Sequence, residues 1–116
     1  MLWLTYDTVI GYSHKLRDVE WVTDKACLDV HDHQRVALQF KIQALPDVDI
    51  DFKEINKIVE NIIFKYHQVN ISEKFEIYST EEFVCRIVDE VETVFGHTRK
   101  VRLHLQETQK YGVTVE

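Results

Sequence analysis

The sequence has few cysteines and glycines, a single proline and no long apolar run. Its two cysteines, Cys27 and Cys85, are too few and too far apart for a disulfide scaffold, so both are expected to be free thiols. No stretch approaches the roughly 18 apolar residues of a membrane-spanning helix, and the first residues form no basic leader. We therefore expect a cytoplasmic protein that does not bind a membrane.

Basic residues are also in the minority. Acidic residues outnumber them by 20 to 14, which gives a formal net charge of −6. This balance argues against nucleic acid as a partner, and it is compatible with an anionic small substrate where a bound cation supplies local positive charge. Hydrophobic residues make up 45% of the chain, enough for a normal core, and the length predicts a single domain over residues 1–116.

Four segments have the composition and partial alternation of strands. Residues 2–12 and 35–44 are rich in β-branched, aromatic and aliphatic side chains. Near the end of the chain, residues 99–108 and 111–116 flank a short polar turn and predict a hairpin. A polar loop at 17–30 separates the first two strands, and its length favours a functional role.

Two helices are expected between the strand pairs. Apolar residues at three- and four-residue spacing follow Asp51, which is expected to cap the first helix. The second helix is expected to begin at Ser79 or Thr80 and to stop at Gly96. Within it, Cys85 lies among apolar residues and is expected to be a buried small hydrophobe.

The order strand, strand, helix, helix, strand, strand predicts an α+β fold. Two hairpins and a helical pair imply a four-stranded antiparallel sheet with both helices on one face. Such a sheet leaves two edges that need cover, and association of subunits would cover them. We therefore expect a homo-oligomer.

Three of the six histidines gather at the first pair of strands. His31 and His33 are two residues apart, so that in a strand both imidazoles project from one face. His14 lies at the end of the preceding strand. Three imidazoles could therefore hold one metal ion and leave a fourth tetrahedral position open, as catalytic zinc requires. The alternative is that these histidines are solvated at a loop.

Two further residues could carry chemistry beside such a metal. Cys27 precedes His31 by four residues, and a metal cation favours the thiolate form of a nearby thiol, which is a competent base or nucleophile. Glu107 closes a strand of the last hairpin. Its carboxylate could accept two parallel N–H bonds from a planar heterocycle, or it could simply be solvated.

With these residues in place, the chain resembles the 6-pyruvoyltetrahydropterin synthase and 6-carboxytetrahydropterin synthase family over nearly its full length. The resemblance rests on the order and spacing of several short motifs. They are YSHKL with His14, CLDVHDHQ with Cys27, His31 and His33, Asp51 and Phe52, YHQVN with Tyr66 and His67, Thr80 and Glu82, and Glu107 and Thr108.

The resemblance implies the T-fold, with subunits that form a barrel and trimers that assemble into hexamers. It implies that the three histidines hold Zn²⁺, that Cys27 is the general acid or base, and that Glu107 and Thr108 bind the pterin. His67 would belong to a proton relay from the neighbouring subunit. Tyr66 stands where the family has the aspartate that orients this histidine, so Tyr66→Asp is expected to raise activity. Asp32 replaces a glycine between the two metal histidines.

The implied activity is that of a zinc-dependent lyase acting on carbon–oxygen or carbon–carbon bonds. The spacing from Cys27 to the histidines favours 6-carboxy-5,6,7,8-tetrahydropterin synthase, which acts on 7,8-dihydroneopterin triphosphate on the queuosine and 7-deazaguanine route. A divergent member would act on another pterin, in the manner of 6-pyruvoyltetrahydropterin synthase or by cleaving the side chain. The sequence is also compatible with a non-catalytic module that binds a pterin or a metal, and with a purely structural α+β protein.

Overall fold

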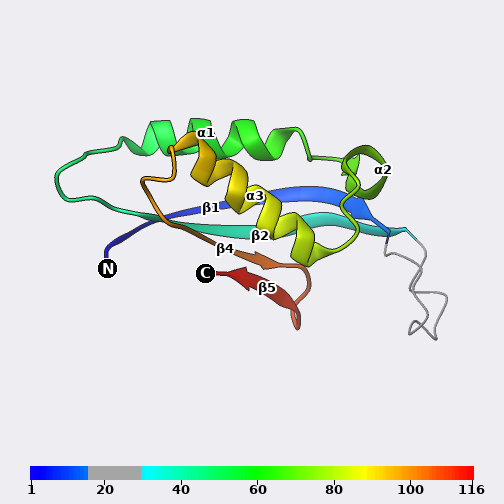
Figure 1. Cartoon of the computed structure of the whole chain (residues 1–116). Helices are drawn as coiled ribbons and strands as arrows, with labels where there is room; N and C mark the ends of the chain where they lie inside the picture. Colours follow the sequence, from blue (N-terminus) through cyan, green and yellow to red (C-terminus); the bar gives the residue numbers. More distant parts are fainter. Residues whose placement is uncertain (16–29) are drawn as a thin grey trace.

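The computed structural model describes residues 1–15 and 30–116, in which one face of a β-sheet is covered by helices (Figure 1). In chain order, the elements are β1 (Trp3–His14), β2 (His31–Gln43), α1 (Phe52–Phe64), β3 (Val69–Asn70), α2 (Ile71–Phe75), α3 (Thr80–Val94), β4 (Val101–Gln106) and β5 (Gly112–Val115).

The sheet has the strand order β3-β1-β2-β4-β5. The two predicted hairpin pairs are confirmed: β1 pairs antiparallel with β2, and β4 with β5. The expectation of four strands, all antiparallel, is wrong. A fifth strand, β3, has two residues and runs parallel to β1 at Tyr12 and Ser13. A strand this short carries no alternation that a sequence pattern could reveal, and the short helix α2 that follows it was also missed.

The predicted helix starts are confirmed. The Asp51 side chain accepts a hydrogen bond from the backbone N–H of Lys53 at the start of α1, and that of Ser79 accepts one from Glu82 at the start of α3. Helix α3 ends at Val94, and the chain then turns through Gly96, whose φ is +62°. None of the helices in residues 1–15 and 30–116 is long and apolar enough to cross a membrane.

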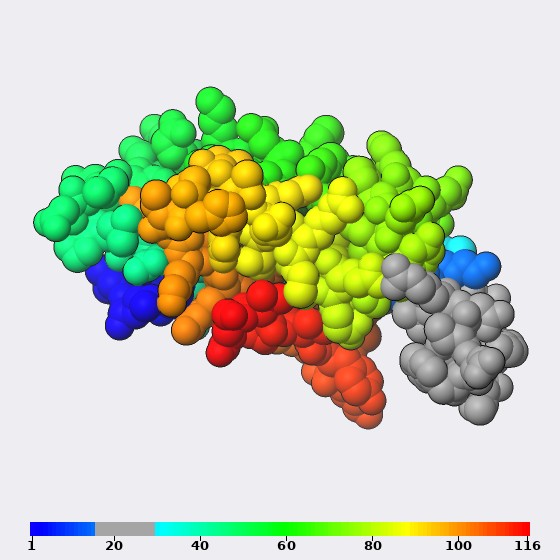
Figure 2. Space-filling model, in the orientation of Figure 1, coloured from blue at the N-terminus to red at the C-terminus, as the bar shows by residue number. Residues whose placement is uncertain are grey.

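The core lies between the sheet and the two long helices. The apolar side chains of β2 that point toward the helices are fully buried, and the alternate ones on the open face are exposed. Helices α1 and α3 pack against each other and together cover this side of the molecule (Figure 2). Cys85 is exposed, so the expectation that it is buried is wrong: the helical turn directs Phe83, Val84 and Ile87 inward and Cys85 outward.

A β-bulge interrupts the pairing of β1 with β2 near the histidines. Ile10 lies opposite Val36 and Tyr12 opposite His33, so Gly11 alone on β1 faces two residues on β2. A Cβ added to Gly11 would lie 2.6 Å from the Gln34 carbonyl oxygen. Gly11 is therefore needed because the bulged backbone of β2 approaches it closely.

We expect Gly11→Ala to lower the free energy of unfolding by about 1–3 kcal/mol, because the added methyl group forces the two strands apart. Urea denaturation measures this loss. Gly96→Ala is the matched control: a Cβ there meets no atom within 4 Å, and only the positive φ opposes it, at about 1 kcal/mol. A loss for Gly11→Ala no larger than for the control would show that the strands adjust without cost.

Candidate metal centre

The bulge determines which way the histidines point. In β1, Ile10, Tyr12 and His14 are buried and face the helices, whereas Val9 is exposed and Ser13 is partly exposed. The extra residue in β2 shifts its alternation by one, so that His33 and His31 face the same side as Val36. The predicted convergence of the histidines on one face is therefore present. It lies at the end of the hairpin, where His14 pairs with His31.

His14, His33 and Glu107 form the tightest cluster of metal-binding side chains in the described part of the chain. The Nε2 atoms of the two imidazoles are 3.1 Å apart, and their rings are nearly parallel at 12°. Oε1 of Glu107 lies 2.7 Å from Nε2 of His33 and 3.6 Å from Nε2 of His14. Glu107 follows β4, so the pairing of β2 with β4 brings it to the histidines.

Neighbouring groups orient this cluster. Nδ1 of His14 lies 3.4 Å from the carbonyl oxygen of Tyr78, which can only accept a hydrogen bond, so the ring hydrogen is assigned to Nδ1 and the Nε2 lone pair is directed at the cluster. The Thr80 hydroxyl donates to Oε1 of Glu107 at 3.3 Å. Thr80 begins α3, so the amino end of this helix helps to fix the carboxylate.

The cluster fits a divalent cation. Two nitrogen ligands on a tetrahedral zinc ion, at the usual bond lengths, lie roughly 3.3 Å apart, close to the spacing of the two Nε2 atoms. Two imidazoles and a carboxylate are ligands that zinc and several other divalent ions accept. Without an ion, His33 supplies the proton that joins its Nε2 to Glu107, and a metal would replace that proton.

Burial lowers the pKa of His33, and the neighbouring His14 and His31 act in the same direction, whereas the charges of Glu107 and Asp32 oppose it. The lowering favours the neutral imidazole at neutral pH. Because only the neutral ring binds a metal, His33 keeps its ligand form to a lower pH than a solvated histidine would.

His31 lies beside the cluster. Its ring is 5.6 Å from that of His14, centroid to centroid, at 22°. The close group of ligand atoms contains Glu107 and does not contain His31. The structure thus brings all three predicted histidines together, with the carboxylate as a fourth candidate ligand that the sequence pattern did not indicate.

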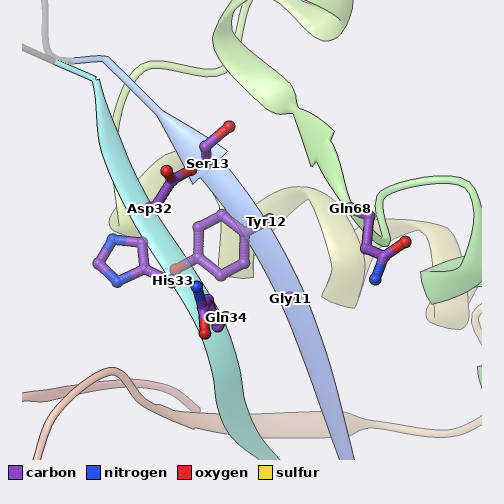
Figure 3. A pocket seen from close by; sticks show the side chains of 7 residues that line it. All are labelled: Gly11, Tyr12, Ser13, Asp32, His33, Gln34 and Gln68. Atoms are coloured by element: carbon purple, nitrogen blue, oxygen red, sulfur yellow. The ribbon is translucent and has the colours of Figure 1, made fainter.

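Tyr12 completes the packing around the two imidazoles and was missed as a site residue. Its ring lies 5.0 Å from that of His33 and 4.6 Å from that of Phe83. The pKa of Tyr12 is raised by burial and by the charge of Glu107, so its hydroxyl stays protonated. A cavity of about 500 Å³ borders this end of the hairpin; Figure 3 shows its lining residues, Gly11, Tyr12, Ser13, Asp32, His33, Gln34 and Gln68.

The two predicted relay residues are placed very differently. His67 is exposed, and its Nδ1 accepts a hydrogen bond from the Gly11 N–H at 3.1 Å, which leaves the ring proton on Nε2. Tyr66 is fully buried between Phe75 and Phe83, and its hydroxyl donates to Glu90 at 2.6 Å. These contacts of a single chain give no support to an orienting role of Tyr66 toward His67.

Of the remaining residues that the resemblance singles out, Thr108 makes other contacts, Asp32 faces away and Cys27 is not described. The Thr108 hydroxyl accepts hydrogen bonds from the backbone N–H groups of Lys110 and Tyr111, so it shapes the turn between β4 and β5. Asp32 is exposed and points to the opposite face from His33, as expected from strand alternation. Cys27 lies outside the described residues.

No protein-family model matches the sequence, and no curated protein matches it either. Among solved structures, the chain superposes on 6-pyruvoyl tetrahydropterin synthase from Caenorhabditis elegans with a TM-score of 0.71 and 17% sequence identity. The match covers 100% of this chain and 96% of that one. The chain has the fold of this synthase. The resemblance inferred from the motifs is thus confirmed for the T-fold, a mixed α+β architecture that comprises, in residues 1–15 and 30–116, five strands and three helices.

Proposed function

We propose that the protein is a cytoplasmic, zinc-dependent pterin synthase that acts on 7,8-dihydroneopterin triphosphate. The observation that carries the proposal is the convergence of His14 and His33 on one point, with Nε2 atoms 3.1 Å apart, within the fold of a pterin synthase. The product we favour is 6-carboxy-5,6,7,8-tetrahydropterin, on the queuosine and 7-deazaguanine route, because Cys27 precedes His31 by four residues.

In this proposal His14, His31 and His33 hold the ion, and His14 is held in its ligand tautomer by the Tyr78 carbonyl. Bound zinc would act as a Lewis acid toward the side-chain oxygens of the substrate. Glu107, fixed by Thr80, accepts N–H bonds from the pterin ring, with Thr108 beside it. Cys27 moves a proton at the substrate side chain, and the Nε2–H of His67 serves the relay.

We also propose that the chain forms the trimers or hexamers, with a barrel of sheets, that its resemblance implies. Within the described residues, β3 pairs only with Tyr12 and Ser13, so the rest of β1 is an edge of the sheet in a single chain. The four-residue strand β5 forms the other edge. Unpaired edges of this kind are commonly covered by association.

A non-catalytic pterin- or metal-binding module is the second candidate. The position of Tyr66 favours this candidate. A buried, uncharged tyrosine whose hydroxyl bonds to Glu90 stands where the resemblance implies a charged aspartate that orients His67. The two candidates share the metal centre and differ in turnover.

The deciding experiment incubates zinc-loaded protein with 7,8-dihydroneopterin triphosphate and identifies the products by mass spectrometry. The proposal expects loss of substrate and formation of 6-carboxy-5,6,7,8-tetrahydropterin. A 6-pyruvoyl or side-chain-cleaved product would establish a divergent synthase. Tight pterin binding without turnover would establish the module, and the absence of both pterin and zinc binding would refute the proposal.

The ligand set is tested by comparing His31→Ala with Glu107→Gln. We expect His31→Ala to weaken zinc binding by at least about tenfold to a hundredfold, and Glu107→Gln to weaken pterin binding more than zinc binding. Titration calorimetry with zinc and then with neopterin separates the two effects. A larger loss of zinc affinity for Glu107→Gln would show that the carboxylate is the third ligand in place of His31.

A further inference from the structure

The Tyr12 hydroxyl is buried beside the metal centre without a hydrogen bond. Tyr12 is 3% exposed, and its oxygen has no hydrogen-bond partner among residues 1–15 and 30–116. Its ring is fixed from two sides, by Phe83 at 4.6 Å and by His33 at 5.0 Å. A buried hydroxyl is costly to leave unpaired, and such exceptions call for a specific explanation.

The surroundings of this hydroxyl are those of a ligand site. His14 and His33, which present their Nε2 atoms to one point, flank the Tyr12 ring at 6.0 Å and 5.0 Å, and Glu107 lies against both imidazoles. Thr80 is a polar neighbour of this hydroxyl, but its own hydroxyl donates to Glu107, and the two hydroxyls form no hydrogen bond with each other. A protonated phenol at this place can donate one hydrogen bond to an acceptor that arrives with a ligand.

We propose that Tyr12 is a specificity-determining residue whose hydroxyl donates a hydrogen bond to a side-chain oxygen of the pterin held at the histidines. This inference rests on the proposed function and assigns to Tyr12 the recognition of the hydroxyl or carbonyl oxygens that the substituent at carbon 6 of the pterin carries. The unpaired donor is a feature of the protein without ligand, and the ligand oxygen satisfies it.

The test compares wild-type protein with Tyr12→Phe, both loaded with zinc, for binding of neopterin and of 6-methylpterin. Neopterin carries a trihydroxypropyl side chain, whereas 6-methylpterin has no side-chain oxygen. We expect Tyr12→Phe to weaken neopterin binding about threefold to tenfold and to leave 6-methylpterin binding unchanged. Because the Tyr12 hydroxyl has no hydrogen-bond partner among the described residues, the melting temperature of the Tyr12→Phe protein is expected to equal or exceed that of the wild type.

Tyr6→Phe is the matched control. Tyr6 lies on the same face of β1, and its hydroxyl lies within hydrogen-bond distance of Glu60, at 2.5 Å, and of Asn56. This variant should lower the melting temperature and leave the affinity for both pterins unchanged.

The inference is overturned if Tyr12→Phe binds neopterin as the wild type does, or if it loses affinity for both pterins equally. If Tyr12→Phe lowers the melting temperature and leaves neopterin binding unchanged, the Tyr12 hydroxyl stabilises the fold through its contact with Thr80 and does not bind the ligand. If the wild type binds neither pterin, the proposed function fails and this inference fails with it, whereas a failure of the inference alone leaves wild-type pterin binding intact.

Discussion

Replacing His33 with alanine is expected to lower the affinity of the protein for zinc by about a thousandfold, or roughly 4 kcal/mol. His33 touches both other members of the tight cluster, with Nε2 3.1 Å from His14 and 2.7 Å from Glu107. Its loss leaves His14 and Glu107 without the ring that spans them. Competition against a chromogenic chelator measures the affinity.

His104→Ala is the control for this prediction. His104 lies on β4 at the open face of the sheet, where its ring bonds to Thr114 and Gln106. Zinc affinity should not change in this variant. A His33→Ala protein that binds zinc as tightly as His104→Ala would show that the ion, if bound, sits elsewhere.

The lowered pKa of His33 gives this binding a defined pH dependence. The folded protein takes up the His33 proton at a lower pH than an unfolded chain does, so the unfolded state binds more protons as the pH falls below the ordinary histidine value of about 6.5. The contribution of His33 to the stability of the metal-free protein is therefore expected to be constant above this pH and to decline below it, whereas its contribution to zinc affinity is expected to decline only at the lower pH at which His33 of the folded protein takes up its proton.

Tyr66→Asp is expected to destabilise the fold severely, by about 3–5 kcal/mol or more. It is therefore not expected to raise activity, although the family resemblance implies that it would. The Tyr66 ring is fully buried, so its removal leaves a cavity between Phe75 and Phe83. The new carboxylate would also lie near Glu90, whose Oε2 is already buried without a partner in the described structure. Thermal unfolding followed by circular dichroism measures the loss.

Tyr66→Phe separates packing from charge. It keeps the ring and removes only the hydrogen bond to Glu90, so a loss of about 1–2 kcal/mol is expected, with unchanged pterin turnover. A Tyr66→Asp protein that folds normally and turns over substrate faster than the wild type would contradict this prediction. It would show that residue 66 does act on His67 in the proton relay.

The architecture was largely predictable because its main elements are amphipathic and capped. Asp51 and Ser79 mark helix starts by chemistry that is visible in the sequence. The β3 and α2 segment was not predictable for the opposite reason. Its turns place Gln68 at φ +56° and Glu76 at φ +57°, and neither residue type indicates a left-handed backbone in the sequence.

The site was predictable in part. Strand alternation placed His31 and His33 on one face, but nothing local indicates that β4 would deliver Glu107 to them, because this requires the pairing of distant strands. The position of Tyr66 could have been read from periodicity. It lies three residues after Ile63 and continues the buried stripe of α1, and this spacing is typical of a core residue.

The bulge opposite Gly11 makes the candidate metal centre depend on how many residues β2 has there, and not only on which residues they are. A chain with the same three histidines but one residue fewer between His33 and Val36 would carry two of the imidazoles on the outer surface of the sheet. It would keep the sheet and the helices and lose the cluster of candidate metal ligands. The length of this short segment should therefore be checked before metal binding is assigned to any related chain.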